Sequence, residues 1–346
     1  MKPLPLEDLD HVLRQTEPLW GQARGRRIFI SGGTGFFGAW LLESLAHCNR
    51  ELGLEVEAVV LTRDPSGFLI RMPHLTNEPS LRFIQGDVCD FSFPHEPFDF
   101  VIHGAAPTVG NANRPDSVLM NVLHTGTRRV LDFAVAAGAK GFLYLSSGAV
   151  YGPLPPNLAH IAEDDLGGLE SLAPDSPYGK GKLAGEQMCA TMALESGIPC
   201  TVARCFTFVG PHLPLDQHFA IGNFIANALA GQPIRVRGDG SPTRSYLYAA
   251  DLAVWLWTML FRGAKFGQTP VIFNVGSAES ISIRDLASIV TETINPAVRV
   301  EIAGDSTLGA RQHRYVPDVS RAEARLGLHP MIGLREAIRR TADWYR

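Results

Sequence analysis

The fold of this chain is decided by the stretch Arg27-Ile28-Phe29-Ile30-Ser31-Gly32-Gly33-Thr34-Gly35-Phe36-Phe37-Gly38. It begins with a short apolar, β-branched run, passes through a glycine-rich turn, and leads into residues whose apolar side chains recur at helical spacing. A strand, a tight glycine turn and a helix in this order are typical of a dinucleotide-binding crossover. Gly32 allows the turn, Gly35 lets the backbone approach a pyrophosphate, and Gly38 lets the helix pack against the strand.

The pyrophosphate is expected at the N-terminus of that helix, where unpaired N–H groups and the helix dipole attract anions. A glycine triad alone also occurs in ordinary turns, so the cofactor interpretation depends on the strand before it and the helix after it. The candidate cofactor residues of this loop are Gly32, Thr34, Gly35, Phe36, Phe37 and Gly38.

The composition is that of an ordinary globular protein with a substantial core. The chain has 346 residues and a formal net charge of −4. No basic field favours nucleic acid, and no acidic tail is present. The apolar run at 253–261 is too short to span a bilayer, and the N-terminus lacks a basic-then-apolar signal peptide. We therefore expect a cytoplasmic protein with no membrane and no nucleic-acid partner.

The five cysteines are scattered along the chain and form no CxxC pair. They are expected to be reduced, rather than to form a disulfide framework or a zinc site. His212 and His218 flank a proline-rich turn, but no cysteine or paired histidine completes a ligand spacing, so no metal is expected.

Strand-like apolar runs alternate with helical patterns along most of the chain. We expect strands at 28–31, 56–62, 81–85, 100–103, 141–146, 200–205 and 271–274, and helices near 37–49, 118–137, 178–196, 252–262 and 334–345. This alternation predicts an α/β fold: a Rossmann-like, doubly wound parallel sheet with a smaller interleaved C-terminal substrate domain. The expected divisions are an N-terminal extension (1–25), a dinucleotide-binding domain (26–210, with about 245–275 returning to it) and a substrate-binding domain (211–244 and 276–346).

Tyr178 and Lys182 begin a predicted helix four residues apart, so both side chains lie on one helical face. A lysine ammonium there can stabilise a tyrosinate and lower the tyrosine pKa toward neutrality, as acid–base catalysis requires. Ser146 and Ser147 end the preceding strand, where a serine could hydrogen-bond the oxygen that gains or loses the proton. The alternative for a Tyr-x-x-x-Lys pattern is a solvated helix face, and the glycine loop and the serine pair upstream favour catalysis.

With these residues the chain resembles the extended short-chain dehydrogenase/reductase family, specifically its nucleotide-sugar NAD-dependent epimerase/dehydratase branch. The resemblance runs from about residue 26 to the C-terminus. Its motifs are 32–38, Gly86-Asp87-Val88, His103-Gly104-Ala105-Ala106, Ser146-Ser147 through Val150-Tyr151-Gly152, Tyr178 with Lys182, Val209-Gly210-Pro211, and Arg244-Ser245-Tyr246-Leu247-Tyr248 followed by Asp251.

The resemblance implies roles for individual residues. Tyr178 and Lys182 hold the nicotinamide ribose, and Ser147 pairs with Tyr178 in catalysis. Asp87 contacts the adenine. Arg244 binds the diphosphate of a nucleotide-linked sugar, a task that suits a guanidinium because it forms bidentate contacts and keeps its charge; a surface salt bridge is its alternative role. The other cofactor contacts implied are Val88, Ala105, Ala106 and Cys205, and the other substrate contacts are Gly148, Ala149 and Asn223.

One departure from the branch bears on the reaction. In the 4,6-dehydratases of the family an Asp-Glu pair follows the catalytic Thr or Ser, and here Gly148 and Ala149 hold those positions. Neither can transfer a proton, so dehydration is disfavoured unless an acid of the long loop, such as Glu163, Asp164 or Asp165, compensates.

A second departure lies on the middle helix. The family often carries an Asn three residues before a Gly-Thr pair, and here Leu123 precedes Gly126-Thr127 in that position. Asn121 is out of register and is assigned no role.

The end of the second strand bears on the choice of cofactor. An acidic residue there usually holds the ribose hydroxyls of NAD, whereas an arginine favours the phosphate of NADP. The strand ends Thr62-Arg63-Asp64, which favours NADP over NAD if Arg63 faces the cofactor, and an ordinary exposed charge is the alternative. Thr62 and Arg63 therefore join the candidate cofactor residues.

The leading hypothesis is an enzyme that transfers a hydride at the 4-position of a nucleotide-linked hexose, using NAD or NADP and the set Ser147, Tyr178 and Lys182. It could be a 4-epimerase that keeps its cofactor or a 4-ketoreductase that consumes it. The alternatives are a 4,6-dehydratase with acids from elsewhere and a non-catalytic dinucleotide-sensing module on the same fold. The resemblance also implies a homodimer, formed by the helices near 118–137 and 178–196.

Overall fold

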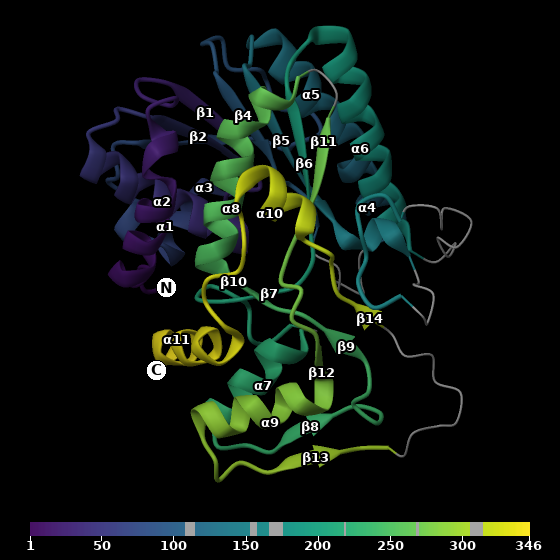
Figure 1. Ribbon diagram of the computed structural model, residues 1–346. Coiled ribbons are helices and arrows are strands. Elements are labelled where there is room, and N and C mark those ends of the chain that lie inside the picture. Colours follow the sequence, from purple (N-terminus) through teal and green to yellow (C-terminus); the bar gives the residue numbers. More distant parts are fainter. Residues whose placement is uncertain (108–114, 153–157, 166–175, 218, 268–269, 305–313) are drawn as a thin grey trace.

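The computed structural model describes residues 1–107, 115–152, 158–165, 176–217, 219–267, 270–304 and 314–346. At its centre is a sheet of seven strands in the order β11-β6-β5-β4-β1-β2-β3, all paired in parallel (Figure 1). The strands are β1 Arg27–Ser31, β2 Glu57–Thr62, β3 Leu81–Gln85, β4 Phe100–His103, β5 Gly141–Ser147, β6 Cys200–Cys205 and β11 Val271–Val275. This confirms the predicted doubly wound sheet.

Helices cover both faces of the sheet, as parallel strands require. Because alternate side chains of a strand point to opposite faces, Ile28 and Ile30 of β1 pack in one core cluster and Phe29 packs in the other. The first cluster includes residues of α2 Phe36–Leu52 and α8 Ala249–Arg262, and the second includes residues of α5 Thr127–Ala136 and α6 Pro177–Ser196. The shorter elements beside them are α3 Pro65–Arg71, α4 Asp116–Asn121, the 3₁₀ turns Pro73–Leu75, Gly148–Tyr151 and Gly263–Phe266, and the π turn Val122–Gly126.

The N-terminal residues form a helix, α1 Leu6–Trp20, that packs against α8 and α2 (Figure 1). Trp20 is fully buried, with its ring centroid 4.9 Å from that of Trp257 and 5.1 Å from that of Phe261. Val12 is also fully buried, whereas Leu6 at the first turn is exposed. The segment before the first strand is therefore part of the main core.

The C-terminal part adds small sheets and helices at one end of the central sheet (Figure 1). The strands are β7 Phe208–Val209 with β10 Leu247–Tyr248, β8 Ile234–Val236 with β13 Val300–Ile302, and β9 Thr243–Arg244 between β12 Ile281–Ser282 and β14 Arg314–Tyr315. The helices at this end are α7 Ala220–Leu229, α9 Ile283–Ile294 and α11 Leu334–Tyr345, whereas α10 Ser320–Leu326 packs against β11 and α8. Within the described residues, no helix combines the length and apolarity needed to cross a membrane.

Candidate active site

The glycine loop lies where the strand order reverses, between the carboxyl ends of β1 and β4, which is where open parallel sheets bind ligands. Gly32 has φ +79°, and a Cβ there would lie 2.4 Å from the carbonyl carbon of Gly104 after β4. A Cβ on Gly38 would lie 2.1 Å from the Gly33 carbonyl oxygen. Both positions therefore require glycine, one for the turn and one for close packing of α2 on the loop.

The N-terminus of α2 has room for an anionic group. Gly35 is its N-cap residue and no side chain caps it. A Cβ on Gly35 would meet only the Gly32 carbonyl oxygen, at 3.6 Å, so space is open above the loop. The first N–H groups of a helix attract a phosphate at such a place, and the residues present fit the pyrophosphate of a dinucleotide. Thr34 lies 3.5 Å from Thr62 between their hydroxyl oxygens, and the Phe37 ring packs on Phe208 beside Phe36.

The charged residues after β2 have different surroundings. Asp64 is the N-cap of α3, and its Oδ1 accepts a hydrogen bond from the Gly67 N–H at 2.8 Å. The Arg63 side chain is exposed, and its carbonyl oxygen accepts a hydrogen bond from Gln85 Nε2 at 3.3 Å. The Asp64 carboxylate thus caps α3, whereas the Arg63 guanidinium makes no such contact within the described part of the chain.

The loops after β3 and β4 supply the other candidate cofactor residues. Asp87 Oδ1 accepts a hydrogen bond from the Cys89 N–H at 3.0 Å, which fixes the turn after β3. Val88 is buried against the π turn, where a Cβ on Gly126 would lie 2.8 Å from Val88 Cγ1. Ala105 and Ala106 directly follow Gly104 and are partly exposed at this edge of the sheet.

His103 links β1 to α5 through contacts of its two ring nitrogens. Its Nδ1 is 2.7 Å from the Ser31 hydroxyl oxygen and its Nε2 is 3.0 Å from that of Thr127. Burial lowers the pKa of His103 to about 3, and the charge of Lys182 lowers it further in the same direction. The imidazole is therefore neutral at physiological pH and joins β1, β4 and α5 as a structural group.

Ser147, Tyr178 and Lys182 meet at the carboxyl end of β5. Ser147 ends β5 opposite Cys205 of β6, and its Oγ accepts a hydrogen bond from the Ala149 N–H at 3.2 Å. Burial raises the pKa of Tyr178 to about 12, nearby Cys205 contributes in the same direction, and a hydrogen bond with the Ser147 side chain opposes the rise. The Lys182 Nζ lies 5.9 Å from the Tyr178 ring centroid. The three predicted residues are thus brought together.

Lys182 differs from the expectation in where its ammonium points. The Nζ donates a hydrogen bond to the Leu145 carbonyl oxygen at 2.7 Å, and burial lowers the pKa of Lys182 to about 8. The Tyr178 pKa is raised rather than lowered, because its burial outweighs the favourable contact with Ser147. In this structure Lys182 therefore contributes a buried cation beside the ring rather than a direct partner of the phenol oxygen.

On the substrate side, Arg244 in β9 and Asn223 in α7 are both partly exposed. Arg244 Nη1 donates a hydrogen bond to the Thr243 carbonyl oxygen at 2.9 Å, and Asn223 Nδ2 donates one to the Gln217 carbonyl oxygen at 2.7 Å. Phe219 packs against the main core, and His218 lies outside the described residues.

The sequence reasoning missed two residues here, Arg314 and Tyr315 of β14. They pair in register with Thr243 and Arg244 of β9, 71 residues earlier in the chain. The Nε of Arg314 is buried and has no hydrogen-bond partner among the described residues, as expected for a group that binds an anionic ligand. The cluster of polar and basic residues at 311–315 was the available signal, but nothing local relates it to Arg244.

The two departures from the branch have structural counterparts. A Cβ on Gly148 would lie 2.6 Å from the Tyr315 hydroxyl oxygen and 2.8 Å from the Phe206 ring, so only glycine fits there. Leu123 is buried, and its side chain would come within 2.6 Å of a Cβ on Gly181 in α6. A packed leucine therefore stands where the branch often has an asparagine.

The acids of the long loop are engaged in other contacts. Glu163 is buried: its Oε1 accepts a hydrogen bond from the Asn274 N–H at 2.8 Å, and its Oε2 lies 3.5 Å from Arg321. Asp164 forms an ion pair with Arg321 at 2.5 Å. Asp165 accepts a hydrogen bond from the Ala162 N–H at 2.8 Å. Each carboxylate thus has a structural partner.

A buried polar network supports the catalytic end of β5. The Arg204 guanidinium binds both carboxylate oxygens of Glu186, with contacts of 2.7–3.2 Å, and both side chains are almost completely buried. Glu186 also accepts a hydrogen bond from the Ser146 hydroxyl at 2.5 Å, and Arg204 donates one to the Tyr151 oxygen at 2.9 Å. The Arg204–Glu186 pair thus fixes Ser146, which precedes Ser147, and the turn of α6 that follows Lys182.

Residues 28–276 match the family described as "NAD dependent epimerase/dehydratase family". The curated protein UDP-glucuronic acid decarboxylase 3 of Arabidopsis thaliana is 30% identical to this chain over 319 residues, which cover 90% of this chain and 86% of the relative.

Solved structures are similar over nearly their whole length. A crystal structure of a UDP-galactose 4-epimerase is 27% identical with a TM-score of 0.72, covering 92% of this chain and 98% of that chain. MoeE5, solved in complex with UDP-glucuronic acid and NAD, is 26% identical with a TM-score of 0.74, covering 92% of this chain and 99% of that chain.

Proposed function

This chain belongs to the NAD-dependent epimerase/dehydratase family, and from that premise we propose that it oxidises the 4-hydroxyl of a nucleotide-linked hexose. The family predicted from the glycine loop and the Tyr-x-x-x-Lys pattern is thereby confirmed. The family modifies nucleotide sugars with NAD. The choice of the 4-position and of the final product is our proposal.

The observation that carries the proposal is the meeting of Ser147 and Tyr178 at the carboxyl end of β5, with Lys182 beside the Tyr178 ring. The glycine loop lies at the same edge of the sheet, so a dinucleotide on that loop would reach these side chains. A hydroxyl, a phenol and a buried cation form a set that can move one proton and stabilise the charge that results.

We assign the roles as follows. Tyr178 takes the proton of the sugar 4-hydroxyl, and Ser147 hydrogen-bonds the same oxygen. Lys182 supplies positive charge that favours the tyrosinate. NAD, when bound, provides the hydride acceptor. Gly32, Gly35 and the α2 N-terminus would hold its pyrophosphate, while Asp87, Val88, Ala105, Ala106, Thr62 and Cys205 lie on the loops and strand ends around it.

Arg244 and Arg314 would bind the substrate diphosphate. Arg314 in β14 pairs with Thr243, the residue before Arg244 in β9, and the buried Nε of Arg314 has no partner among the described residues. Two guanidinium groups can give several charge-assisted hydrogen bonds to a diphosphate. Asn223 of α7 is the further candidate substrate contact.

Three reactions can use hydride transfer at the 4-position. A 4-epimerase oxidises the 4-hydroxyl and returns the hydride to the opposite face of the ketone. A 4-ketoreductase carries out only the second step, the transfer of a hydride to a 4-ketone. Where carbon 6 is a carboxylate, the 4-ketone makes the sugar a β-keto acid, which loses carbon dioxide readily. The similarity to a UDP-glucuronic acid decarboxylase favours keeping decarboxylation as a second candidate.

Dehydration is less well supported. Gly148 and Ala149 carry no acid, and Glu163, Asp164 and Asp165 have structural partners. A non-catalytic dinucleotide-sensing module would not need Ser147, Tyr178 and Lys182 together.

The test is to identify the nucleotide released on denaturing the purified protein, and then to incubate the protein with UDP-glucose or UDP-glucuronic acid and NAD. Retained NAD with conversion of UDP-glucose to its 4-epimer supports the epimerase. Release of carbon dioxide from UDP-glucuronic acid supports the decarboxylase. Preference for NADPH over NADH supports the reductase and the assignment of Arg63 to the extra phosphate.

The matched variants are Tyr178→Phe and Tyr246→Phe, which each remove one buried phenol oxygen. We expect Tyr178→Phe to lower turnover at least a thousandfold and Tyr246→Phe to change it less than threefold. Full activity of Tyr178→Phe would show that the proposed mechanism is wrong.

A further inference from the structure

Tyr315 reaches the catalytic end of β5 from a distant part of the chain. It lies in β14, whose pairing with β9 places it level with Arg244. Its ring centroid is 4.7 Å from that of Phe206 and 5.8 Å from the Arg244 guanidinium carbon. Contacts with an aromatic ring and with a cation therefore fix the Tyr315 ring.

The phenol oxygen of Tyr315 lies directly beside Gly148. A Cβ built on Gly148 would be 2.6 Å from that oxygen, so the missing side chain of residue 148 is what allows Tyr315 to approach. The residue before Gly148 is Ser147, whose side chain acts on both phenols and lowers the pKa of Tyr315 as well as that of Tyr178, against the effect of burial. One serine hydroxyl thus stands between two phenols.

A count of donors and acceptors decides which way the Ser147 proton points. A serine hydroxyl has one proton to donate and two lone pairs to accept with. The Ala149 N–H can only donate, and it donates to Ser147 Oγ at 3.2 Å. Burial raises the pKa of the Tyr315 phenol, so at neutral pH it keeps its proton and can donate to the second lone pair. The proton of Ser147 is then directed to Tyr178 or to the substrate oxygen.

We propose that Tyr315 is a positioning residue which, together with the Ala149 N–H, fixes Ser147 as a hydrogen-bond donor toward Tyr178. A serine held in this way stabilises the tyrosinate form of Tyr178, because it can only donate to that oxygen. Tyr315 thus acts on proton transfer through Ser147, without itself touching the reacting atoms. The inference rests on the proposed function, in which Tyr178 moves the proton.

Other ionisable groups also face Tyr178, and the test must separate them from Tyr315. Lys182 lies on the same helix, Cys205 is on β6, and Tyr144 is on β5. Arg244 faces Tyr315 from β9. A change of Tyr315 to phenylalanine keeps the ring against Phe206 and removes only the hydroxyl, so these groups stay in place.

The experiment compares the wild type, Tyr315→Phe, Ser147→Ala and the double variant between pH 6 and 10, with UDP-glucose or UDP-glucuronic acid and NAD. We expect Tyr315→Phe to lower kcat/KM about tenfold at pH 7, the loss that a one-unit rise of the Tyr178 pKa produces. KM should stay within twofold. In the Ser147→Ala background, loss of the Tyr315 hydroxyl should have no further effect.

A second readout does not need turnover. The ¹³Cζ resonance of Tyr178, assigned with Tyr178→Phe, should shift at pH 8 in Tyr315→Phe and stay unchanged in the control Tyr246→Phe. An equal loss of activity in the Ser147→Ala background, or a Tyr178 resonance that does not move in Tyr315→Phe, would overturn the proposal and make Tyr315 a substrate contact or a packing residue. If Tyr178→Phe keeps its activity, the proposed function is wrong, and the resonance shift still decides whether Tyr315 acts through Ser147.

Discussion

At the scale of single residues, the candidate site contains a buried ammonium group, that of Lys182, whose removal from water costs free energy. Lys182 is almost completely buried, and its ammonium makes one described hydrogen bond, to the Leu145 carbonyl oxygen. Burial lowers the pKa of Lys182 from 10.5 to about 8. The folded chain therefore binds fewer protons than the unfolded chain between about pH 8 and 10.5, and the charge of Lys182 destabilises the fold most strongly below pH 8.

We predict that Lys182→Met stabilises the protein while abolishing its activity. The pKa shift of Lys182 implies that its charge costs roughly 3 kcal/mol at pH 7. Because the substitution also removes the hydrogen bond to Leu145, we expect the free energy of unfolding to rise by about 2 kcal/mol at that pH. The gain should fall to about 1 kcal/mol or less at pH 10, where the unfolded lysine also begins to lose its proton. Urea denaturation at the two pH values measures the difference.

The control for this prediction is Lys180→Met, which changes an exposed lysine of the same helix. It should alter the free energy of unfolding by less than about 0.5 kcal/mol at either pH. A Lys182→Met protein that is less stable than the wild type at pH 7 would contradict the argument from burial.

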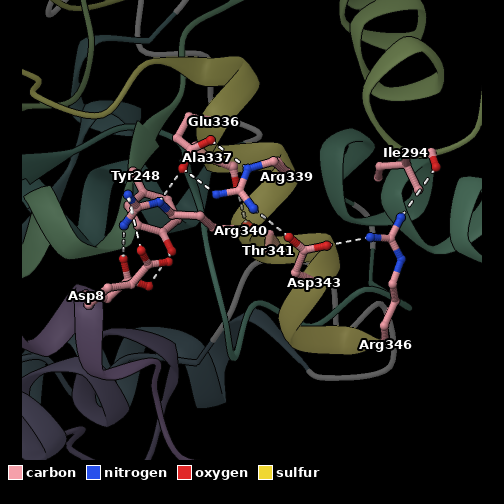
Figure 2. A network of polar contacts seen from close by, with 11 residues as sticks. Asp8, Tyr248, Ile294, Glu336, Ala337, Arg339, Arg340, Thr341, Asp343 and Arg346 are labelled. Carbon is pink, nitrogen blue, oxygen red and sulfur yellow. Dashed lines mark hydrogen bonds and ion pairs between the residues drawn. The ribbon is translucent and has the colours of Figure 1, made fainter.

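At the scale of elements, α1 is attached to the body by polar contacts as well as by its tryptophan. Figure 2 shows Asp8 of α1 facing Tyr248 and Arg340, with Arg340 also bound to Glu336 of α11. Asp8 is fully buried, and it accepts hydrogen bonds from Tyr248 at 2.6 Å and from Arg340 at 2.7 Å. One carboxylate thus joins the first and the last helices of the chain.

We predict that Asp8→Ala lowers the free energy of unfolding by about 3 kcal/mol, because it leaves a buried phenol and a guanidinium without their acceptor. It should also make the N-terminal helix a site of early cleavage in limited proteolysis. Glu7→Ala is the control: Glu7 is exposed and 3.7 Å from Arg340, so its loss should cost less than about 0.5 kcal/mol. Equal effects of the two substitutions would mean that burial of Asp8 is not what holds α1.

The elements also differ from the sequence prediction in two details. Helix 118–137 is interrupted by a π turn at Val122–Gly126, which an unbroken apolar period does not reveal. Asp251, which directly precedes the helix expected at 252–262, lies inside α8, because α8 begins at Ala249. Its carboxylate instead accepts the N–H groups of Met331 and Ile332, each at 2.9 Å, and so fastens the chain after α10 to α8.

At the scale of the whole molecule, the helices α4, α5 and α6 expose apolar side chains. Val118, Val135 and Leu194 are 46%, 47% and 66% exposed. We propose that this side forms a homodimer, as the family resemblance implies. Light scattering at micromolar concentration should give twice the 37.6 kDa mass of one chain.

Replacing Leu194 and Val135 with glutamate should shift that dimer to the monomer without unfolding it, because charges at the centre of an apolar interface lose their hydration. Ile70→Glu is the matched control, since Ile70 is 80% exposed on α3 and belongs to the other part of the sheet. A wild-type monomer, or a dimer that survives the double substitution, would contradict the proposed interface.

The sequence by itself determined the central sheet, the glycine loop and the Tyr178–Lys182 pair, because each is a local pattern. Every predicted strand of the sheet is present, with ends within one residue of those expected. Only the tertiary structure decided that Tyr315 lies near Ser147 and level with Arg244, and that Arg204 binds Glu186. Periodicity shows which face of an element is buried, but not which distant segment covers it. That depends on the path of the whole chain. Here β14, which lies near the C-terminus, places Tyr315 beside the catalytic end of β5.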